Sequence, residues 1–85
     1  MPTVKERVLS AISRASGVPV QNLEGKQTLK GDLVISHQSF VVLAQDLRAI
    51  IQDTHASETL WLKDIETAAA TVDSVVRVVQ EKSRP

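Results

Sequence analysis

The feature that most constrains the fold is a run of apolar residues with helical spacing in the middle of the chain. Its members recur at steps of three and four residues: Phe40, Leu43, Ala44, Leu47, Ile50 and Ile51. This spacing lines one side of a helix with 3.6 residues per turn. Ser36 precedes the run and is a good N-cap, because a serine oxygen can accept a hydrogen bond from a free amide of the first turn. The sequence therefore predicts a buried helix from about residue 37 to 52, with the polar cluster Ser36-His37-Gln38-Ser39 at its positively polarised end.

A first helix is predicted from about residue 3 to 16. Thr3 and Glu6 have the spacing of a capping box, in which each side chain satisfies the other residue's backbone amide. Gly17 follows as a left-handed terminator. Residues 17 to 35 then contain all three glycines and single apolar residues without sustained periodicity, namely Val18, Val20, Leu23, Leu29 and Leu33. We expect a long connection that these residues anchor to the core.

Two more helices are predicted in the C-terminal half. Ser57 and Glu58 can start a short helix whose bulk comes from residues 60 to 62, with Trp61 partly exposed because three adjacent large residues cannot share one face. A long helix is predicted over residues 65 to 81, capped by Asp64 or Thr67. Its apolar face would consist of Ala69, Val72, Val75, Val76 and Val79. Residues 82 to 85 are expected to fray.

The composition excludes several functional classes. The 85 residues are enough for one domain, residues 1–85, with one modest core. Ten basic residues balance ten acidic ones, and the only aromatic residues are one Phe and one Trp, so we expect no nucleic-acid partner. The absence of cysteine excludes disulfides and thiolate chemistry. With no apolar run of about 20 residues and no signal-peptide pattern, we expect a cytoplasmic protein without a membrane span.

The order of these elements resembles that of acyl carrier proteins. Gly17-Val18 resembles the Gly-Val that follows the first helix in that family. Residues 28 to 33, Thr-Leu-Lys-Gly-Asp-Leu, resemble the family's loop, where a Ser/Thr and a large apolar residue precede Asp-Leu. Residues 65 to 73 resemble the start of its last helix, Ile-x-Thr followed by apolar positions and Asp. The resemblance implies an all-α four-helix bundle of the acyl-carrier type, with a long loop between helices 1 and 2 and a short helix 3.

The resemblance also implies a carrier function without catalytic activity. In this family a serine in an Asp-Ser-Leu motif at the head of the second helix bears 4′-phosphopantetheine, whose thiol holds acyl intermediates for partner enzymes. A phosphodiester suits this position, because a helix N-terminus offers free amides and the positive end of the dipole. Here an ungapped alignment places the motif on Ser36-His37-Gln38, so that His37 occupies the place of the serine. A one-residue contraction of the preceding loop makes Ser36 the attachment residue, and Ser39 is a further candidate hydroxyl.

Partner recognition departs from the family as well. Family members commonly carry an acidic second helix, whereas residues 37 to 52 hold only Asp46 and Arg48 as charged residues besides His37, with Val42 facing solvent. We expect a monomer whose second helix docks a phosphopantetheinyl transferase and acyl-processing enzymes of fatty-acid, polyketide or related metabolism through an apolar surface. Phe40 and Trp61 are core or rim residues, although a carrier fold places the acyl chain between its second and third helices.

Other readings of the same residues remain. Ser36 can be a plain N-cap, in a degenerate carrier that acts as an unmodified protein-interaction module; an unrelated small helical bundle would mimic the order of elements. Adjacent Ser36 and His37 point in different directions on a helix start, so a nucleophile–base pair is not expected. His37 and His55 lack tight ligand spacing with Asp46 or Asp53, and we predict no metal site.

Overall fold

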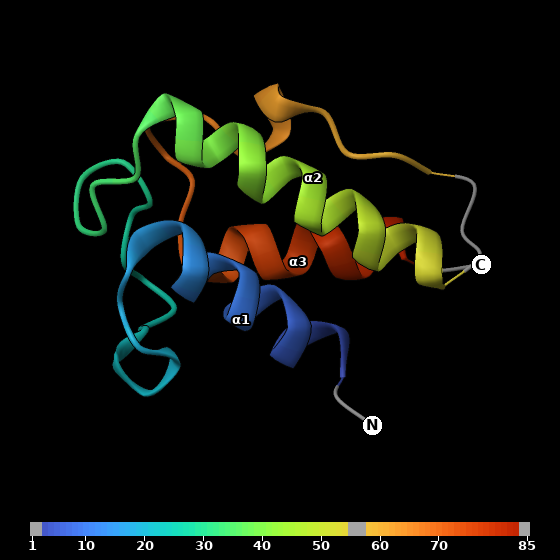
Figure 1. Ribbon diagram of the computed structural model, residues 1–85, viewed down its shortest axis with the longest axis horizontal. Helices are drawn as coiled ribbons and strands as arrows, with labels where there is room; N and C mark the ends of the chain where they lie inside the picture. Colours follow the sequence, from blue (N-terminus) through green and yellow to red (C-terminus); the bar gives the residue numbers. More distant parts are fainter. Residues whose placement is uncertain (1–2, 55–57, 84–85) are drawn as a thin grey trace.

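Three α-helices form the frame of the protein. The computed structural model describes residues 3–54 and 58–83. In these residues the α-helices are α1 (Val4–Ser16), α2 (His37–Asp53) and α3 (Val72–Lys82), with 3₁₀ turns η1 (Val20–Asn22) and η2 (Leu62–Asp64) between them. The ribbon in Figure 1 shows the three helices running side by side, with the long α1–α2 connection gathered at one end of the molecule. The predicted all-α class is confirmed, and α1 and α2 have their predicted positions.

The ends of α1 and α2 have the predicted caps. Thr3 Oγ1 accepts a hydrogen bond from the Glu6 amide at 3.1 Å, and the Glu6 carboxylate accepts from the Thr3 amide at 3.4 Å. Gly17 ends α1 in the left-handed conformation, with φ of 77°. Ser36 caps α2 through the Ser39 amide. Local sequence signals alone therefore fix three of the four ends of these two helices.

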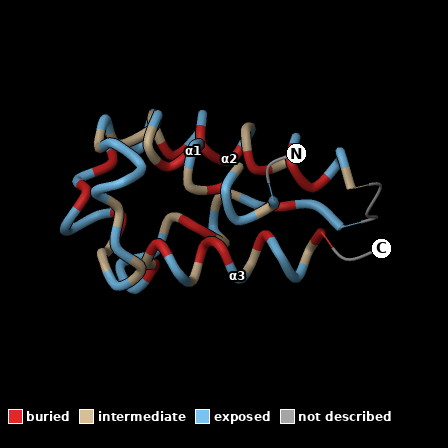
Figure 2. The backbone as a smooth tube through the Cα atoms, turned by 90° about the horizontal axis from the view of Figure 1, so that it is seen from below, coloured by how far each residue is buried: buried red, intermediate tan, exposed pale blue. Residues whose placement is uncertain are grey.

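The core lies where the three helices meet. Figure 2 shows buried positions on the sides of the helices that face one another, and exposed positions on the outside. All six periodic apolar residues of α2 are buried, and the α3 residues Val72, Val75, Val76 and Val79 face them. From α1 come Val8, Ala11 and Ile12. Burial of one apolar stripe on each helix is the main stabilising term for helices this short, which are marginal in isolation.

The long α1–α2 connection is anchored as predicted, mainly through its second half. Leu29 and Leu33 are buried, and Leu23 and Val18 pack partly against the core, whereas Val20 is exposed contrary to expectation. The backbone of the loop also pairs with the segment that leads into α3. The Leu29 amide donates to the Ala70 carbonyl at 3.1 Å, and the Val72 amide donates to the Gln27 carbonyl at 3.0 Å. The loop is therefore fixed to the start of α3.

The predicted four-helix bundle is wrong, because the short third helix does not form in the described residues. Only η2 is present there, held by the Trp61 amide donating to the Asp64 carboxylate at 2.8 Å. Leu60 is buried, Leu62 is half-buried and Trp61 is 57% exposed. The three residues thus point in different directions, which an extended segment ending in one tight turn accommodates better than an amphipathic helix. Ser57 lies outside the described residues.

The predicted start of the last helix is also wrong. Residues 65 to 71 are not helical, and α3 begins at Val72 with Thr71 as its cap instead of Asp64 or Thr67. Ala69, predicted to be on the buried face, is exposed. The bonds to residues 27 and 29 extend the backbone around residue 71, and this pairing overrides the helical propensity of the alanine run. At the other end, Lys82 belongs to α3 and Ser83 is buried, so neither frays; residues 84–85 are not described.

None of the helices in residues 3–54 and 58–83 is long and apolar enough to cross a membrane.

Candidate site at the head of α2

Ser36 stands at the exposed N-terminus of α2. Its Oγ accepts a hydrogen bond from the Ser39 amide at 3.2 Å and donates one to Ser39 Oγ at 3.1 Å. Its backbone is extended, with φ of −75° and ψ of 162°, so Ser36 is the boundary residue and His37 is the first residue inside the helix. Of the three candidate positions, Ser36 is therefore the cap and His37 begins the helix. Ser39 lies within the first turn and is half-buried.

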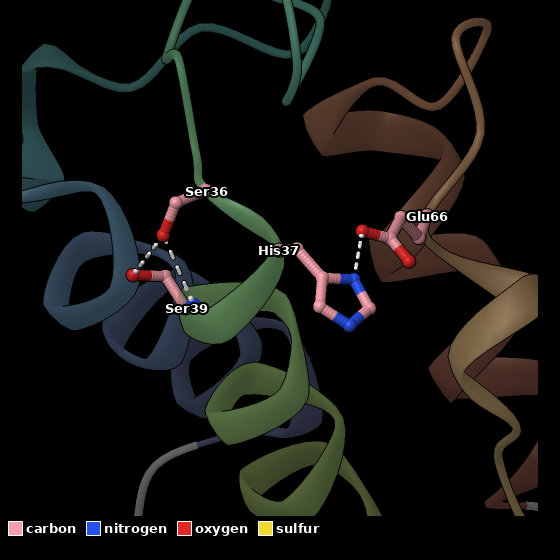
Figure 3. A network of polar contacts seen from close by, with 4 residues as sticks. All are labelled: Ser36, His37, Ser39 and Glu66. Atoms are coloured by element: carbon pink, nitrogen blue, oxygen red, sulfur yellow. Dashed lines mark hydrogen bonds and ion pairs between the residues drawn. The ribbon is translucent and has the colours of Figure 1, made fainter.

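His37 points away from Ser36, toward the segment between η2 and α3. Its Nδ1 lies 2.7 Å from Glu66 Oε2, and its side chain is 67% exposed. Figure 3 shows the Ser36 and Ser39 hydroxyls on one side of α2 and the His37–Glu66 pair on the other. The hydroxyl of Ser36 and the imidazole of His37 are thus engaged with different partners, and the geometry does not assemble a nucleophile–base pair.

Val34 adds local strain just before the cap. Its φ of 53° lies in the left-handed region, which is unfavourable for a β-branched residue, and its side chain is 75% exposed. Leu33 and Ile35 on either side are both buried. Because the residues before and after Val34 are both anchored in the core, the backbone at Val34 is held in this conformation. The sequence reasoning missed Val34, because no local pattern marks a valine for positive φ.

Glu66 was also missed by the sequence reasoning, since it lies 29 residues from His37. On the same side of α2, Arg48 Nε donates to the Leu60 carbonyl at 2.6 Å. His37 and Arg48 are eleven residues apart, which is close to three full turns, so they share one face of the helix. This face therefore holds the segment of residues 60 to 66 by one contact at each end.

The outer surface of α2 is poor in charge and carries exposed apolar residues. Val41 is 37% exposed and Val42 is 55% exposed, as predicted for Val42. Asp53, at the far end, forms an ion pair with Arg7 at 2.7 Å. The head and middle of the helix thus present valines and amides, with no acidic stripe. Within the described part of the chain no three His, Asp or Glu side chains cluster as metal ligands do; His55 lies outside it.

No protein-family model matches the chain, and neither a curated protein nor a solved structure matches it.

Proposed function

We propose that the protein is an acyl-carrier-like protein that tethers acyl intermediates on a 4′-phosphopantetheine arm attached to Ser36. The observation that carries the proposal is the exposed Ser36 hydroxyl at the boundary residue of α2, following a long anchored loop. The protein would serve fatty-acid, polyketide or related metabolism as a monomer, and the chemistry on the acyl group would belong to its partner enzymes.

The attachment chemistry suits this hydroxyl. In the transfer, Ser36 Oγ attacks the phosphorus of coenzyme A that carries the pantetheine, a new P–O bond forms, and adenosine 3′,5′-bisphosphate leaves. The hydroxyl proton passes to a base of the transferase, and nothing is oxidised or reduced. The ester oxygen keeps a lone pair for the Ser39 amide, and the phosphodiester gains the positive end of the α2 dipole. Modification therefore leaves the cap of α2 in place.

The shift from His37 to Ser36 requires one residue fewer in the preceding loop. Loops absorb a change of length more easily than helices do.

Partner enzymes and the transferase would dock on α2. Because the exposed residues near its head are Ser36, His37, Gln38, Val41 and Val42, with no acidic residue among them, binding would depend on apolar contact more than on charge. We therefore expect association rates that change little with ionic strength, unlike those of electrostatically steered carriers.

A second candidate function is an unmodified protein-interaction module that retains the carrier fold. It is favoured by the exposure of Val42 and Trp61, and by the two hydrogen bonds that engage the Ser36 hydroxyl within its own helix turn. In this reading Ser36 is only a cap.

Incubation of the full chain with coenzyme A and a promiscuous phosphopantetheinyl transferase, followed by intact-mass measurement, separates the two candidates. The wild type and Ser39→Ala should each gain one phosphopantetheine, and Ser36→Asn should gain none. Asparagine caps helices about as well as serine, so Ser36→Asn removes the hydroxyl without removing the cap. Absence of an adduct with several transferases would leave the interaction module, and an adduct on Ser36→Asn would move the site.

A further inference from the structure

The Ser36 hydroxyl is directed to the side of α2 that faces α1. Ser36 Oγ contacts both the amide and the hydroxyl of Ser39, and Figure 3 shows these two side chains together on that side. Val42 and Asp46 follow Ser39 at spacings of three and seven residues and so lie on the same face of the helix. A substituent on Ser36 Oγ therefore starts at the edge of this face.

A hollow lies between α1 and α2 along this face. Its volume is about 380 Å³, and it is lined by Arg14, Ala15, Gln38, Ser39, Val42 and Asp46. A second hollow of about 300 Å³ shares Arg14 and Asp46 with it and continues between the two helices toward Arg7. Together they form a groove, which we call the α1–α2 groove, of the size found for small-molecule sites.

The chemistry of this lining matches a pantetheine arm. The arm has a phosphodiester, a hydroxyl, two amides and a pair of methyl groups. The Arg14 guanidinium can pair with the phosphodiester, Gln38 and Asp46 can bond the hydroxyl and the amides, and Ala15 and Val42 offer apolar contact to the methyl groups. Polar groups for the phosphodiester and amides and apolar side chains for the methyl groups are thus both present next to Ser36.

The opposite side of α2 makes contacts with the segment of residues 60 to 66, and the hollow of about 640 Å³ on that segment is lined by Trp61, Leu62, Lys63 and Glu66 and by no residue of α2. His37 and Glu66 lie 2.7 Å apart between the head of α2 and the segment before α3, and Arg48 binds the Leu60 carbonyl farther along. Val41 is four residues from His37 and lies on that same face. An arm on Ser36 would have to pass the His37–Glu66 pair to reach it.

We infer that the arm on Ser36 lies in the α1–α2 groove, with its phosphodiester beside Arg14, and not between α2 and the segment that replaces a third helix. This inference rests on the proposed function. It assigns α1 a direct part in holding the arm, through Arg14 and Ala15.

The chain has no cysteine, so the thiol of the arm is the only thiol after loading. Single cysteine substitutions can therefore report where the arm lies. Val42→Cys puts a thiol in the groove. Val41→Cys is the matched control, with a thiol on the face of α2 that carries His37, and Leu62→Cys puts a thiol on the segment of residues 60 to 66. Each loaded variant is equilibrated in glutathione buffers of graded redox ratio, and the intramolecular disulfide is measured by intact mass after thiol alkylation.

We expect the effective concentration of the arm thiol to be about tenfold higher in the Val42→Cys variant than in Val41→Cys or Leu62→Cys, read as a tenfold difference in the disulfide equilibrium. In the Val42→Cys background, Arg14→Glu should lower it about threefold through repulsion of the phosphodiester. The same charge change on the same helix, Lys5→Glu, should leave it unchanged.

The loading step and the disulfide step fail in distinguishable ways. Absence of the phosphopantetheine adduct refutes the carrier function and the groove together. Loading on Ser36 with disulfide formation in Val41→Cys or Leu62→Cys that equals or exceeds that in Val42→Cys refutes the groove alone and leaves the carrier function standing. Equal effects of Arg14→Glu and Lys5→Glu overturn the role of Arg14.

Discussion

Thr71 is the residue whose replacement tests the observed start of α3 most sharply. Its Oγ1 accepts from the Ser74 amide at 3.1 Å, and its amide donates to Ser74 Oγ at 2.8 Å, so the two residues form a reciprocal cap. Thr71 is also bridged to Thr28 of the long loop. Thr71→Ala removes the hydroxyl half of the cap while leaving the backbone pairing possible.

The expected loss is about 1–2 kcal/mol, the range for N-cap threonines replaced by alanine. A helix of 11 residues is only marginally stable on its own, so the loss of a hydrogen bond in its first turn should lower the stability measurably. In a domain of this size each kcal/mol lowers the Tm by about 4–8 °C. Thermal and urea unfolding followed by circular dichroism measure both quantities, and Thr71→Ser should recover most of the loss.

Thr67→Ala is the control. Thr67 is exposed and precedes the observed helix by five residues, so its replacement should change the free energy of unfolding by less than about 0.5 kcal/mol. A loss at Thr67→Ala equal to or larger than that at Thr71→Ala would refute this reasoning, because the helix would then start at the earlier threonine.

Three further substitutions test the backbone and the core by the same unfolding measurement. Val34→Gly should stabilise the protein by about 0.5–1 kcal/mol, since it relieves a valine held at φ of 53° at some cost in chain entropy; a loss of stability would show that this valine is not strained. Gly17→Ala should cost about 1 kcal/mol from its φ of 77° alone, because an added Cβ meets no atom within 4 Å; an unchanged Tm would contradict this. Phe40→Ala should cost about 3–5 kcal/mol, because Phe40 is fully buried; a loss below about 1 kcal/mol would contradict its place in the core.

The parts of the fold that the sequence predicts correctly are those set by local chemistry. The Thr3–Glu6 box, Gly17 and Ser36 act within a few residues of chain, and their caps are present. The apolar periodicity of α2 can also be recognised without knowing which elements pack against the helix, because it indicates only that one face is buried.

The errors lie where distant backbone decides the local structure. The alanine run of residues 68 to 70 favours a helix, but bonds from Leu29 and to Gln27, more than 40 residues away in the chain, extend the segment up to Thr71. Of residues 65 to 73, which resemble the start of the last carrier helix, only Val72 and Asp73 are therefore helical. Glu66 and Val34 at the candidate site were missed for the same reason, since tertiary contacts set both.

The same distinction applies to the site. Ser36 could be predicted as a cap from the sequence, whereas the direction of its hydroxyl, toward Ser39 and α1, could not, because it depends on the helix boundary to within one residue. That boundary makes Ser36 the cap and His37 the first residue of α2.

Intact mass after incubation with coenzyme A and a phosphopantetheinyl transferase measures directly whether Ser36 carries the arm. We predict one phosphopantetheine on the wild type and none on Ser36→Asn, with both proteins folded. A wild type that stays unmodified with several transferases, or a Ser36→Asn variant that is loaded, would contradict it.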